Sequence, residues 1–260
     1  MDASAPDLVT AGDRRLAPLW VRFFMKCFER GCTLGGGPRV ATIRWAVNFH
    51  KVITLFVIYG MMVGYHEFST AAWVYLALHG IYGYTWLIKD IVYPNRALDM
   101  PLTVGGVIYL YVALIGWYWL TPWLMIAGHV RPDGWTIFVA IALHTLGVVL
   151  MATADVQKNL LMRYRAGLVT DGVFRYTRNP NYLGEIMIYS AYCLLAGHWL
   201  AWAILAYASV TVFFRRMLAK DASIARYPGW ADYKARTGLL IPWALLNGRA
   251  IADLVKREPA

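Results

Sequence analysis

The chain has 260 residues, of which 59% are hydrophobic, and it carries 12 Trp and 17 Tyr. Only 15% of its residues are charged, against about 25% in soluble domains. This composition excludes an ordinary soluble protein and predicts an integral membrane protein. The formal net charge of +10 is explained by a cytoplasmic face beside anionic lipid, so it gives no reason to expect nucleic acid as a partner.

The N-terminal segment, 1–44, precedes the apolar part of the chain. Within it we expect residues 19–34 to form an interfacial amphipathic helix, with aromatic side chains on one side and Arg22, Lys26 and Arg30 on the other. We assign the remainder, 45–260, to a single transmembrane domain.

The apolar stretches of this domain set the number of membrane spans, because roughly 17 to 25 residues cross a hydrocarbon core. They cover residues 46–65, 70–88, 102–127, 135–154 and 183–214. The last stretch is too long for one span, and we expect it to break near Gly197-His198-Trp199. The sequence therefore predicts an all-α, polytopic bundle of about six transmembrane helices.

The distribution of basic residues predicts the orientation of this bundle. With six spans, all but one of the 25 Lys and Arg residues fall on the same side, and the exception is Arg131. Because basic loops stay in the cytoplasm, both termini are expected there. The host membrane would be the cell membrane in a bacterium and the endoplasmic reticulum in a eukaryote.

A dense group of polar side chains follows the fourth apolar stretch, in an expected cytoplasmic loop over 155–182 that leads into the next span. It contains Asp155, Gln157, Lys158, Arg163, Arg175, Arg178, Asn181, Tyr182 and Glu185. So many hydrogen-bond donors predict an anionic ligand.

Asn179-Pro180-Asn181 predicts the start of a helix, because Pro suits a first helical position and disfavours a helix before it. Free backbone N–H groups would then face the cytoplasm beside Arg175 and Arg178, which can grip phosphate or carboxylate. Glu185 would share a helix face with Asn181 and accept hydrogen bonds from an amide, ribose or amino group. The alternative is a structural cap, with Arg178 reaching the membrane surface and Glu185 paired to Arg or Lys.

A second polar group follows the last span. Arg216 and Lys220 stand four residues apart on one helical face, and Asp221, Trp230 and Tyr233 come after them. We expect this segment to fold back under the bundle and close the pocket. The alternative is a set of solvated basic residues beside the membrane.

Histidines give no reason to expect a metal. His79, His144 and His198 lie within or between the spans, and none has a second His or carboxylate at ligand spacing on its helix. We interpret them as packing residues.

Three motifs resemble a known family. They are DVQK at 155–158, RNPNYLGE at 178–185, and RYPGWADY at 226–233 followed by LIPW at 240–243. Residues 135–243 thereby resemble the C-terminal half of the membrane reductases that include steroid 5-alpha-reductases and sterol C14 reductases, and especially their relatives in the DUF1295 group.

This resemblance implies a cofactor, NADPH, bound on the cytoplasmic side within residues 155–243. It also implies hydride delivery to a carbon–carbon double bond of a steroid, sterol or enone-like lipid. The positions that match cofactor contacts are Asp155, Gln157, Lys158, Arg163, Arg178, Asn181, Tyr182, Glu185, Arg216 and Lys220.

A second class resembles the same motifs. Isoprenylcysteine carboxyl methyltransferases and phospholipid methyltransferases carry a similar Arg-His-Pro-x-Tyr-x-Gly motif and bind S-adenosylmethionine. Here Asn179 replaces the histidine, and Lys220-Asp221 stands where those enzymes usually have paired glutamates. A cation suits a phosphate of NADPH, so charge matching favours the reductase.

The expected catalytic residues are Tyr84 and Glu185. Tyr84 is chosen over Tyr82 as the phenol that polarises a substrate carbonyl, because a Tyr with a pKa of about 10 is protonated at neutral pH. The N-terminal half lacks the Gln-Glu pair of steroid 5-alpha-reductases. The expected partners are a lipophilic substrate and membrane lipid, with no obligate protein partner.

Overall fold

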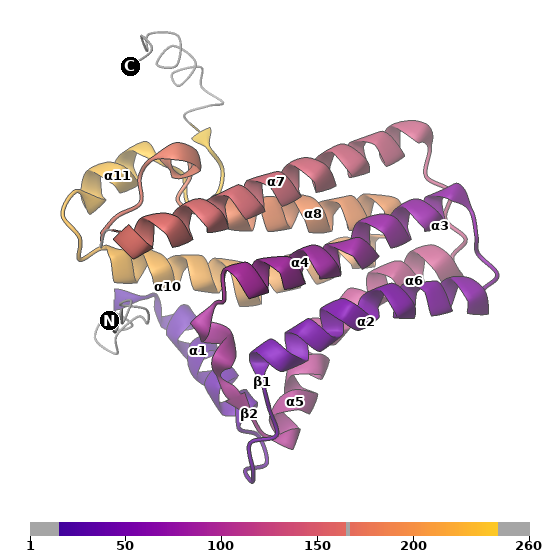
Figure 1. Cartoon of the computed structure of the whole chain (residues 1–260), viewed down its shortest axis with the longest axis horizontal. Coiled ribbons are helices and arrows are strands. Elements are labelled where there is room, and N and C mark those ends of the chain that lie inside the picture. The colour runs from indigo at the N-terminus through magenta and orange to yellow at the C-terminus, as the bar shows by residue number, and fades with distance from the viewer. Residues whose placement is uncertain (1–15, 165–166, 244–260) are drawn as a thin grey trace.

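The computed structural model describes residues 16–164 and 167–243. Long helices run side by side through most of the molecule (Figure 1). Within these residues the only strands are β1 (Ala41–Thr42) and β2 (Pro101–Leu102), a minimal antiparallel pair with Ala41 opposite Leu102. The predicted all-α membrane bundle is confirmed.

The helices follow one another in a simple order, with several π and 3-10 turns inserted. They are α1 (Leu19–Cys32), α2 (Ile43–Gly64), α3 (Thr70–Tyr75), a π turn (Leu76–Gly80), α4 (Ile81–Val92) and a 3-10 turn (Arg96–Asp99). Next come α5 (Val104–Leu110), a π turn (Tyr111–Ile115), a 3-10 turn (Gly116–Trp119), α6 (Leu120–Ala127), α7 (Gly134–Tyr164) and a 3-10 turn (Gly172–Arg175). The chain continues with α8 (Pro180–Ala196), α9 (Trp199–Ala208), a π turn (Ser209–Phe214), α10 (Arg215–Ile224) and α11 (Trp230–Arg236).

Four helical segments in the described chain are long and apolar enough to cross a membrane. They are Ile43–Gly64, Val104–Ala127, Gly134–Tyr164 and Trp199–Ile224. The protein is therefore an integral membrane protein, while the six spans and the placement of the termini stay predictions.

The expected break near Gly197 is confirmed. Gly197 adopts a left-handed conformation with φ of 59°, which ends α8. The next helix begins at once, because the His198 Nδ1 accepts a hydrogen bond from the Leu200 N–H at 3.1 Å. A glycine stop followed by a side-chain cap therefore divides the apolar stretch into two helices.

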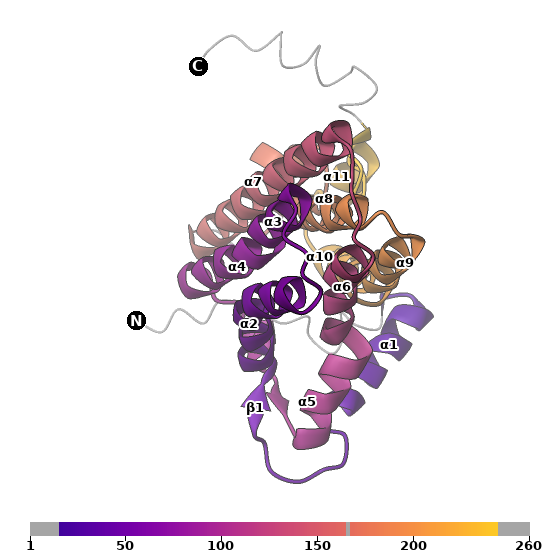
Figure 2. The same cartoon turned by 90° about the vertical axis from the view of Figure 1, so that its right-hand side faces the viewer.

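Helices α7 and α8 lie against each other over much of their length (Figures 1 and 2). They approach most closely at Gly147 and Gly184. A Cβ atom on Gly147 would stand 2.6 Å from the Gly184 carbonyl oxygen, so only glycine permits this contact. The close approach brings the end of α7 against the start of α8, where the polar motifs lie.

The loop expected over 155–182 is partly wrong, because α7 continues to Tyr164. Asp155, Gln157, Lys158 and Arg163 therefore stand on a helix. The sequence between 155 and 164 contains no Gly or Pro that would stop a helix, and the first glycine is Gly167.

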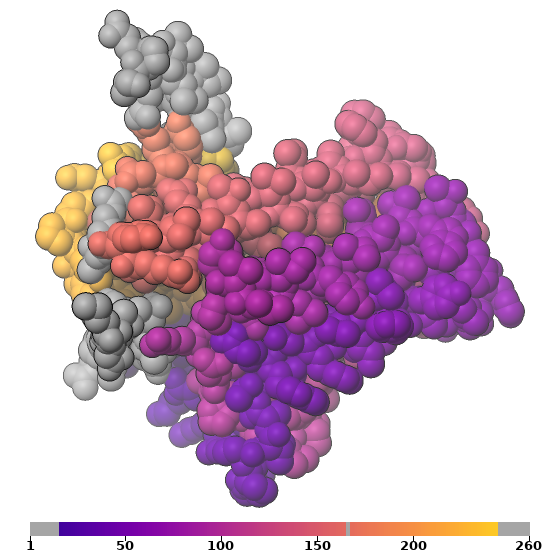
Figure 3. Space-filling view, viewed as in Figure 1, coloured from indigo at the N-terminus to yellow at the C-terminus, as the bar shows by residue number. Residues whose placement is uncertain are grey.

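The bundle has two contrasting ends. The basic end comprises the last turns of α4 and α7, the first turn of α8, and helices α10 and α11, and Figure 3 shows the yellow α11 at this end. The opposite end contains the loops 65–69 and 128–133. Helix α1 packs Val21 beside Ala219 of α10 and leaves Leu19 and Phe23 exposed. A helix is thus present at the expected residues, and its placement at the membrane surface stays a prediction.

Candidate functional site

Helix α8 carries the first part of the site. It begins at Pro180 with Asn179 as its N-cap residue, as predicted from the Asn-Pro-Asn sequence. Glu185 stands just over one turn into this helix and is 9% exposed. A carboxylate has thus been placed inside the bundle near the basic end.

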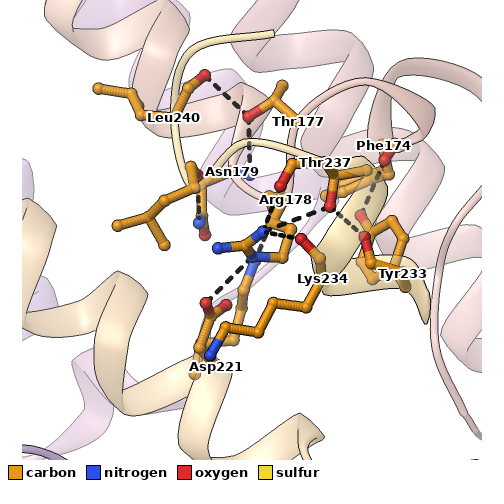
Figure 4. A network of polar contacts seen from close by, with 11 residues as sticks. Phe174, Thr177, Arg178, Asn179, Asp221, Tyr233, Lys234, Thr237 and Leu240 are labelled. Carbon is orange, nitrogen blue, oxygen red and sulfur yellow. Dashed lines mark hydrogen bonds and ion pairs between the residues drawn. The ribbon is translucent and has the colours of Figure 1, made fainter. Parts of the chain in front are cut away.

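Arg178 makes several contacts within the fold (Figure 4). Its side chain is 6% exposed, and its Nε donates to the Asp221 Oδ2 at 3.0 Å. Its Nη1 donates to the Thr237 carbonyl oxygen at 2.5 Å. The prediction that Arg178 grips a phosphate does not fit this geometry, because Asp221 and α11 already engage the guanidinium.

The expected fold-back of the C-terminal segment is present (Figure 4). The Tyr233 hydroxyl donates to the Phe174 carbonyl oxygen at 2.8 Å, and the Thr177 hydroxyl donates to that of Leu240 at 2.8 Å. The Trp230 ring lies 5.7 Å from the Arg178 guanidinium. Helix α11 and the residues that follow it, up to Leu240, therefore hold the segment before α8, and Tyr233 contributes to this closure.

Gln157 also makes a contact within the fold. Its Nε2 donates to the Asp171 carbonyl oxygen at 2.7 Å, and its Oε1 accepts from the Val173 N–H at 3.2 Å. Gly172 between them has φ of 55°, and a Cβ atom there would collide with Gln157. Gln157 thus holds the loop after α7, and its predicted contact with a cofactor stays a prediction.

The remaining predicted basic residues differ in burial. Lys158 and Arg163 are exposed on the last turns of α7, and Arg175 is half-buried with its guanidinium 6.0 Å from the Tyr176 ring. Asn181 is half-buried at the start of α8. Lys158 and Arg163 are therefore fully accessible at the basic end, and Arg175 and Asn181 are partly accessible.

Asp155 is held by a lysine from another helix. Lys89 of α4 forms a close ion pair with Asp155 of α7, and the Lys89 ammonium also lies 4.4 Å from the Trp86 ring. This pair joins α4 to α7 beside Glu185.

Several charges surround the Glu185 carboxylate. The cations that influence it are Lys89, Lys51 and Arg216, and the second anion nearby is Asp155. Within the described chain, Glu185 itself has no hydrogen bond or ion pair. A buried carboxylate without its own partner is costly, which makes Glu185 a candidate functional residue.

Positive charge exceeds negative charge around this point. Arg178 and Asp221 neutralise each other. The remaining cationic side chains are Lys51, Lys89, Arg216 and Lys220, and the remaining carboxylates are Asp155 and Glu185. Lys220 donates to the Arg178 carbonyl oxygen at 2.6 Å and has Lys158 nearby, while Arg216 lies beside Tyr182. The site therefore suits an anionic ligand.

Two buried acceptors in the same region are unsatisfied by the described residues. The Asn179 Oδ1 and the Asp221 Oδ1 are enclosed and have no hydrogen-bond partner there. Oxygens of this kind accept from hydroxyl or amino groups.

Lys51 belongs to the site although the sequence analysis did not single it out. It stands on α2 inside the first apolar stretch, and its Nζ donates to the Tyr189 hydroxyl at 3.1 Å. The same Nζ lies 4.5 Å from the centre of the Tyr82 ring. A lysine inside an apolar helix is the signal that could have revealed it.

Tyr84 does not join this group. Tyr82 and Tyr84 point about 200° apart around α4, because successive helical residues are separated by about 100°. Tyr82 is buried against Lys51, whereas half-buried Tyr84 has no ring contact or hydrogen bond with any residue of the described ranges. The geometry therefore brings Tyr82, and not Tyr84, beside Lys51, and the catalytic role of Tyr84 stays a prediction.

The histidines pack against aromatic rings. His79 stacks on Tyr192 with 4.2 Å between ring centres, and its Nδ1 lies 3.2 Å from the Tyr75 hydroxyl. No group of three His, Cys, Asp or Glu residues that could hold a metal ion occurs in residues 16–164 and 167–243.

Comparison with known proteins supplies two findings. Residues 97–237, more than half of the chain, match the model of the family DUF1295, whose description is "Protein of unknown function (DUF1295)". A shorter segment of 34 residues is 47% identical to the uncharacterized protein C7D4.09c of Schizosaccharomyces pombe. This second match covers 13% of the present chain and only 12% of the yeast protein.

Proposed function

The chain belongs to the DUF1295 family of steroid 5-alpha-reductase-like membrane proteins, and on that premise we propose that it is an NADPH-dependent reductase of a lipid carbon–carbon double bond. The observation that carries the proposal is the excess of cations around Glu185, a buried carboxylate without its own partner. This arrangement supplies positive charge for phosphates and an acceptor deeper in the bundle.

The chain's own residues would divide the binding of NADPH between them. Lys220, Lys158 and Arg216 lie at the basic end, where they can neutralise the phosphates. Glu185 lies deeper and can accept from the carboxamide or ribose. When bound, NADPH supplies a hydride to the substrate, and the residues around it bind, orient and exclude water.

Other residues would keep this site in shape. The Arg178–Asp221 pair fixes the start of α8 relative to α10, and the Lys89–Asp155 pair fixes α4 relative to α7. Pre-organised donors need no rearrangement when the ligand binds. These pairs are thus positioning residues in the proposal.

Charge distinguishes NADPH from S-adenosylmethionine. The methyl donor carries a positive sulfonium, which an excess of cations repels. Asp221 stands where a carboxylate would serve its amino group, but Arg178 already takes up the charge of Asp221. The reductase is therefore favoured over the methyltransferase.

A lipid-facing groove offers a route for the substrate. It has a volume of about 410 Å³ and is lined by Met61, Tyr111, Val112, Gly116, Trp117, Trp119, Leu120 and Trp123. Its apolar, largely aromatic lining suits the body of a lipid entering from the bilayer.

Thermal unfolding of the purified protein in mild detergent tests the proposal. A ligand at about 100 times its Kd stabilises the native state by about 2.7 kcal/mol. We expect NADPH to raise the Tm and S-adenosylmethionine to leave it unchanged. Lys220→Ala should weaken the NADPH effect, while Lys26→Ala on the exposed face of α1 should not. Stabilisation by S-adenosylmethionine alone would contradict the proposal and favour a methyltransferase.

A further inference from the structure

Arg215 is a buried cation that has no anion beside it. It is the first residue of α10 and is only 8% exposed. In the described part of the chain, Arg215 forms no ion pair, whereas Arg178 at the same end of the bundle is paired with Asp221. The side chains that influence the Arg215 guanidinium most strongly include no carboxylate. They are those of Arg216, Tyr182, Tyr109 and Cys32.

Most of the hydrogen-bonding capacity of this guanidinium is unused. The Arg215 Nε donates to the Thr211 carbonyl oxygen at 2.8 Å, and the guanidinium carbon lies 5.0 Å from the centre of the Phe28 ring. No residue in 16–164 or 167–243 accepts a hydrogen bond from the two terminal nitrogens, and neither nitrogen is fully enclosed. Two free terminal nitrogens can hold a phosphate by two parallel hydrogen bonds.

Three helices meet around this side chain. Helix α1 lies beside α5 and α10 (Figures 1 and 2), and its Phe28 ring faces Arg215. The end of α1 rests on α5, because a Cβ atom on Gly31 would collide with the Tyr109 ring. The half-buried Tyr109 has no hydrogen-bond partner among the described residues, so its hydroxyl adds a donor from α5. The junction of α1, α5 and α10 therefore presents donors without an acceptor.

The place of Arg215 along its membrane segment sets the depth of its charge. The segment Trp199–Ile224 is long and apolar enough to span, and Arg215 follows Trp199 by 16 residues. That separation is about 24 Å along a helix, against a hydrocarbon core of about 30 Å. Trp199 is 72% exposed, and Trp is enriched at membrane interfaces. With Trp199 at one interface, Arg215 lies just inside the other, where a charge needs a partner.

Helix α1 supplies an apolar surface beside this charge. Trp20, Phe23 and Phe24 are spaced by three and four residues, so they share one face of α1, and all three are exposed. Arg22 and Lys26 are exposed on a neighbouring face. An aromatic face next to basic residues suits the boundary between lipid headgroups and acyl chains. A phospholipid has both parts, a phosphate for the guanidinium and an acyl chain for the aromatic face.

We propose that the junction of α1, α5 and α10 binds one anionic phospholipid, whose phosphate is held by Arg215. A net negative headgroup is favoured, because no carboxylate is among the groups that influence Arg215 most and could receive a cationic headgroup such as choline. In the predicted orientation this end also faces the cytoplasmic leaflet, where anionic lipids are found.

The lipid site is separate from the proposed cofactor site. Successive residues of a helix point about 100° apart. Arg216 accordingly lies beside Tyr182 of α8, whereas Arg215 lies against Phe28 of α1. Binding of the lipid does not depend on the proposed reductase function.

Thermal unfolding of the full-length protein in mild detergent tests the lipid site. Dioleoylphosphatidylglycerol is titrated into the native protein, with dioleoylphosphatidylcholine and inorganic phosphate as separate arms. We expect phosphatidylglycerol to raise the Tm at concentrations where the other two leave it unchanged. Equal stabilisation by phosphatidylcholine would overturn the recognition of an anionic headgroup. Equal stabilisation by inorganic phosphate would overturn the lipid as the ligand and leave a site for a free anion.

Variants of Arg215 test the assignment of the phosphate. Arg215→Met should raise the phosphatidylglycerol concentration that gives half of the Tm shift by about tenfold or more, because it removes charged hydrogen bonds. Arg96→Met is the matched control, since Arg96 is an exposed arginine on the same predicted side of the membrane. An unchanged half-point in a correctly melting Arg215→Met would refute the site. Should that variant fail to fold, Arg215→Lys replaces it, because lysine cannot form two parallel bonds, and an unchanged half-point there overturns the assignment.

NADPH added to the same samples distinguishes the two sites. Arg215→Met should keep any rise in Tm that NADPH causes in the native protein. Loss of the NADPH response with a retained response to phosphatidylglycerol would assign Arg215 to the cofactor and overturn the lipid site. A native protein that responds to phosphatidylglycerol and ignores NADPH would support the lipid site and refute the proposed reductase.

Discussion

Two buried glutamates at opposite ends of the bundle have opposite environments. Glu67, in the loop between α2 and α3, is 3% exposed and accepts hydrogen bonds from Arg131 at 2.7 Å and from the Ser69 N–H at 3.1 Å, with His129 Nδ1 at 2.7 Å. Glu185 is buried almost as fully but has no such partner in the described part of the chain. The first carboxylate has its partners within the fold, and we propose that the second binds a ligand.

This difference separates structural from functional charge. Removing one partner of a buried charge pair strands the other charge, whereas a buried charge without a partner costs stability itself and is a candidate for a functional role. The basic end contains both paired and unpaired buried charges, because Arg178 and Asp221 pair with each other near Glu185. Removing a paired charge such as Arg178 should therefore mainly lower stability, and removing Glu185 should mainly weaken ligand binding.

The largest loss of stability is expected when the ion pair of Arg178 and Asp221 at the basic end is broken. Arg178→Ala leaves Asp221 buried without its cation, which should lower the free energy of unfolding by about 3–5 kcal/mol. Chemical denaturation in detergent measures this loss. The double variant Arg178→Met with Asp221→Leu should regain much of the stability, because it leaves no unpaired charge. A double variant as unstable as the single one would show that the pair is not what holds α8 to α10.

A smaller loss is expected for Glu67→Ala. The variant removes charged hydrogen bonds worth about 1.5–3 kcal/mol, but it leaves Arg131 and His129 exposed to water, so no buried cation is stranded. Thermal unfolding compares it with the native protein. An unchanged Tm would mean that the loops 65–69 and 128–133 are held by other contacts.

The contribution of Glu67 should depend on pH. Burial raises its pKa, but hydrogen bonds from Arg131, Ser69 and His129 outweigh burial and lower the pKa from 4.5 to about 2. The folded state therefore favours the ionised form. The stability that Glu67 adds is fully present above pH 4.5 and is lost as the pH falls through about 2. The stability gap between the native protein and Glu67→Ala should close over this range, and a constant gap would contradict the assignment.

The smallest effect on the ligand-free protein is expected for Glu185→Ala. Removing a buried charge without a partner also removes its desolvation cost, so stability should change by less than about 1 kcal/mol or rise. Thermal unfolding without ligand checks this result. A loss as large as that of Arg178→Ala would show that Glu185 has a structural partner after all.

The sequence predicted those features that depend on local signals. Asn179-Pro180 marked the start of α8 because proline suits only a first turn, and Gly197 marked its end because glycine adopts positive φ readily. The polar motifs identified the region of the site. Local chemistry was sufficient in these cases.

Features that depend on tertiary pairing could not be predicted in this way. Arg178 was expected to face a ligand, but its partner Asp221 is 43 residues away along the chain. Lys51 lies beside the aromatic rings of Tyr82 and Tyr189 only because α4 and α8 pack against α2. The choice between Tyr82 and Tyr84 required knowing which face of α4 meets α2. Sequence patterns name the residues that matter, and packing decides which of them face one another.

The most direct test compares NADPH-induced stabilisation in two matched variants, Glu185→Ala and Glu67→Ala. We predict that NADPH no longer raises the Tm of Glu185→Ala, although that variant melts like the native protein without ligand. Glu67→Ala should melt at a lower temperature and yet respond to NADPH as the native protein does. An NADPH response that survives in Glu185→Ala and disappears in Glu67→Ala would contradict the account.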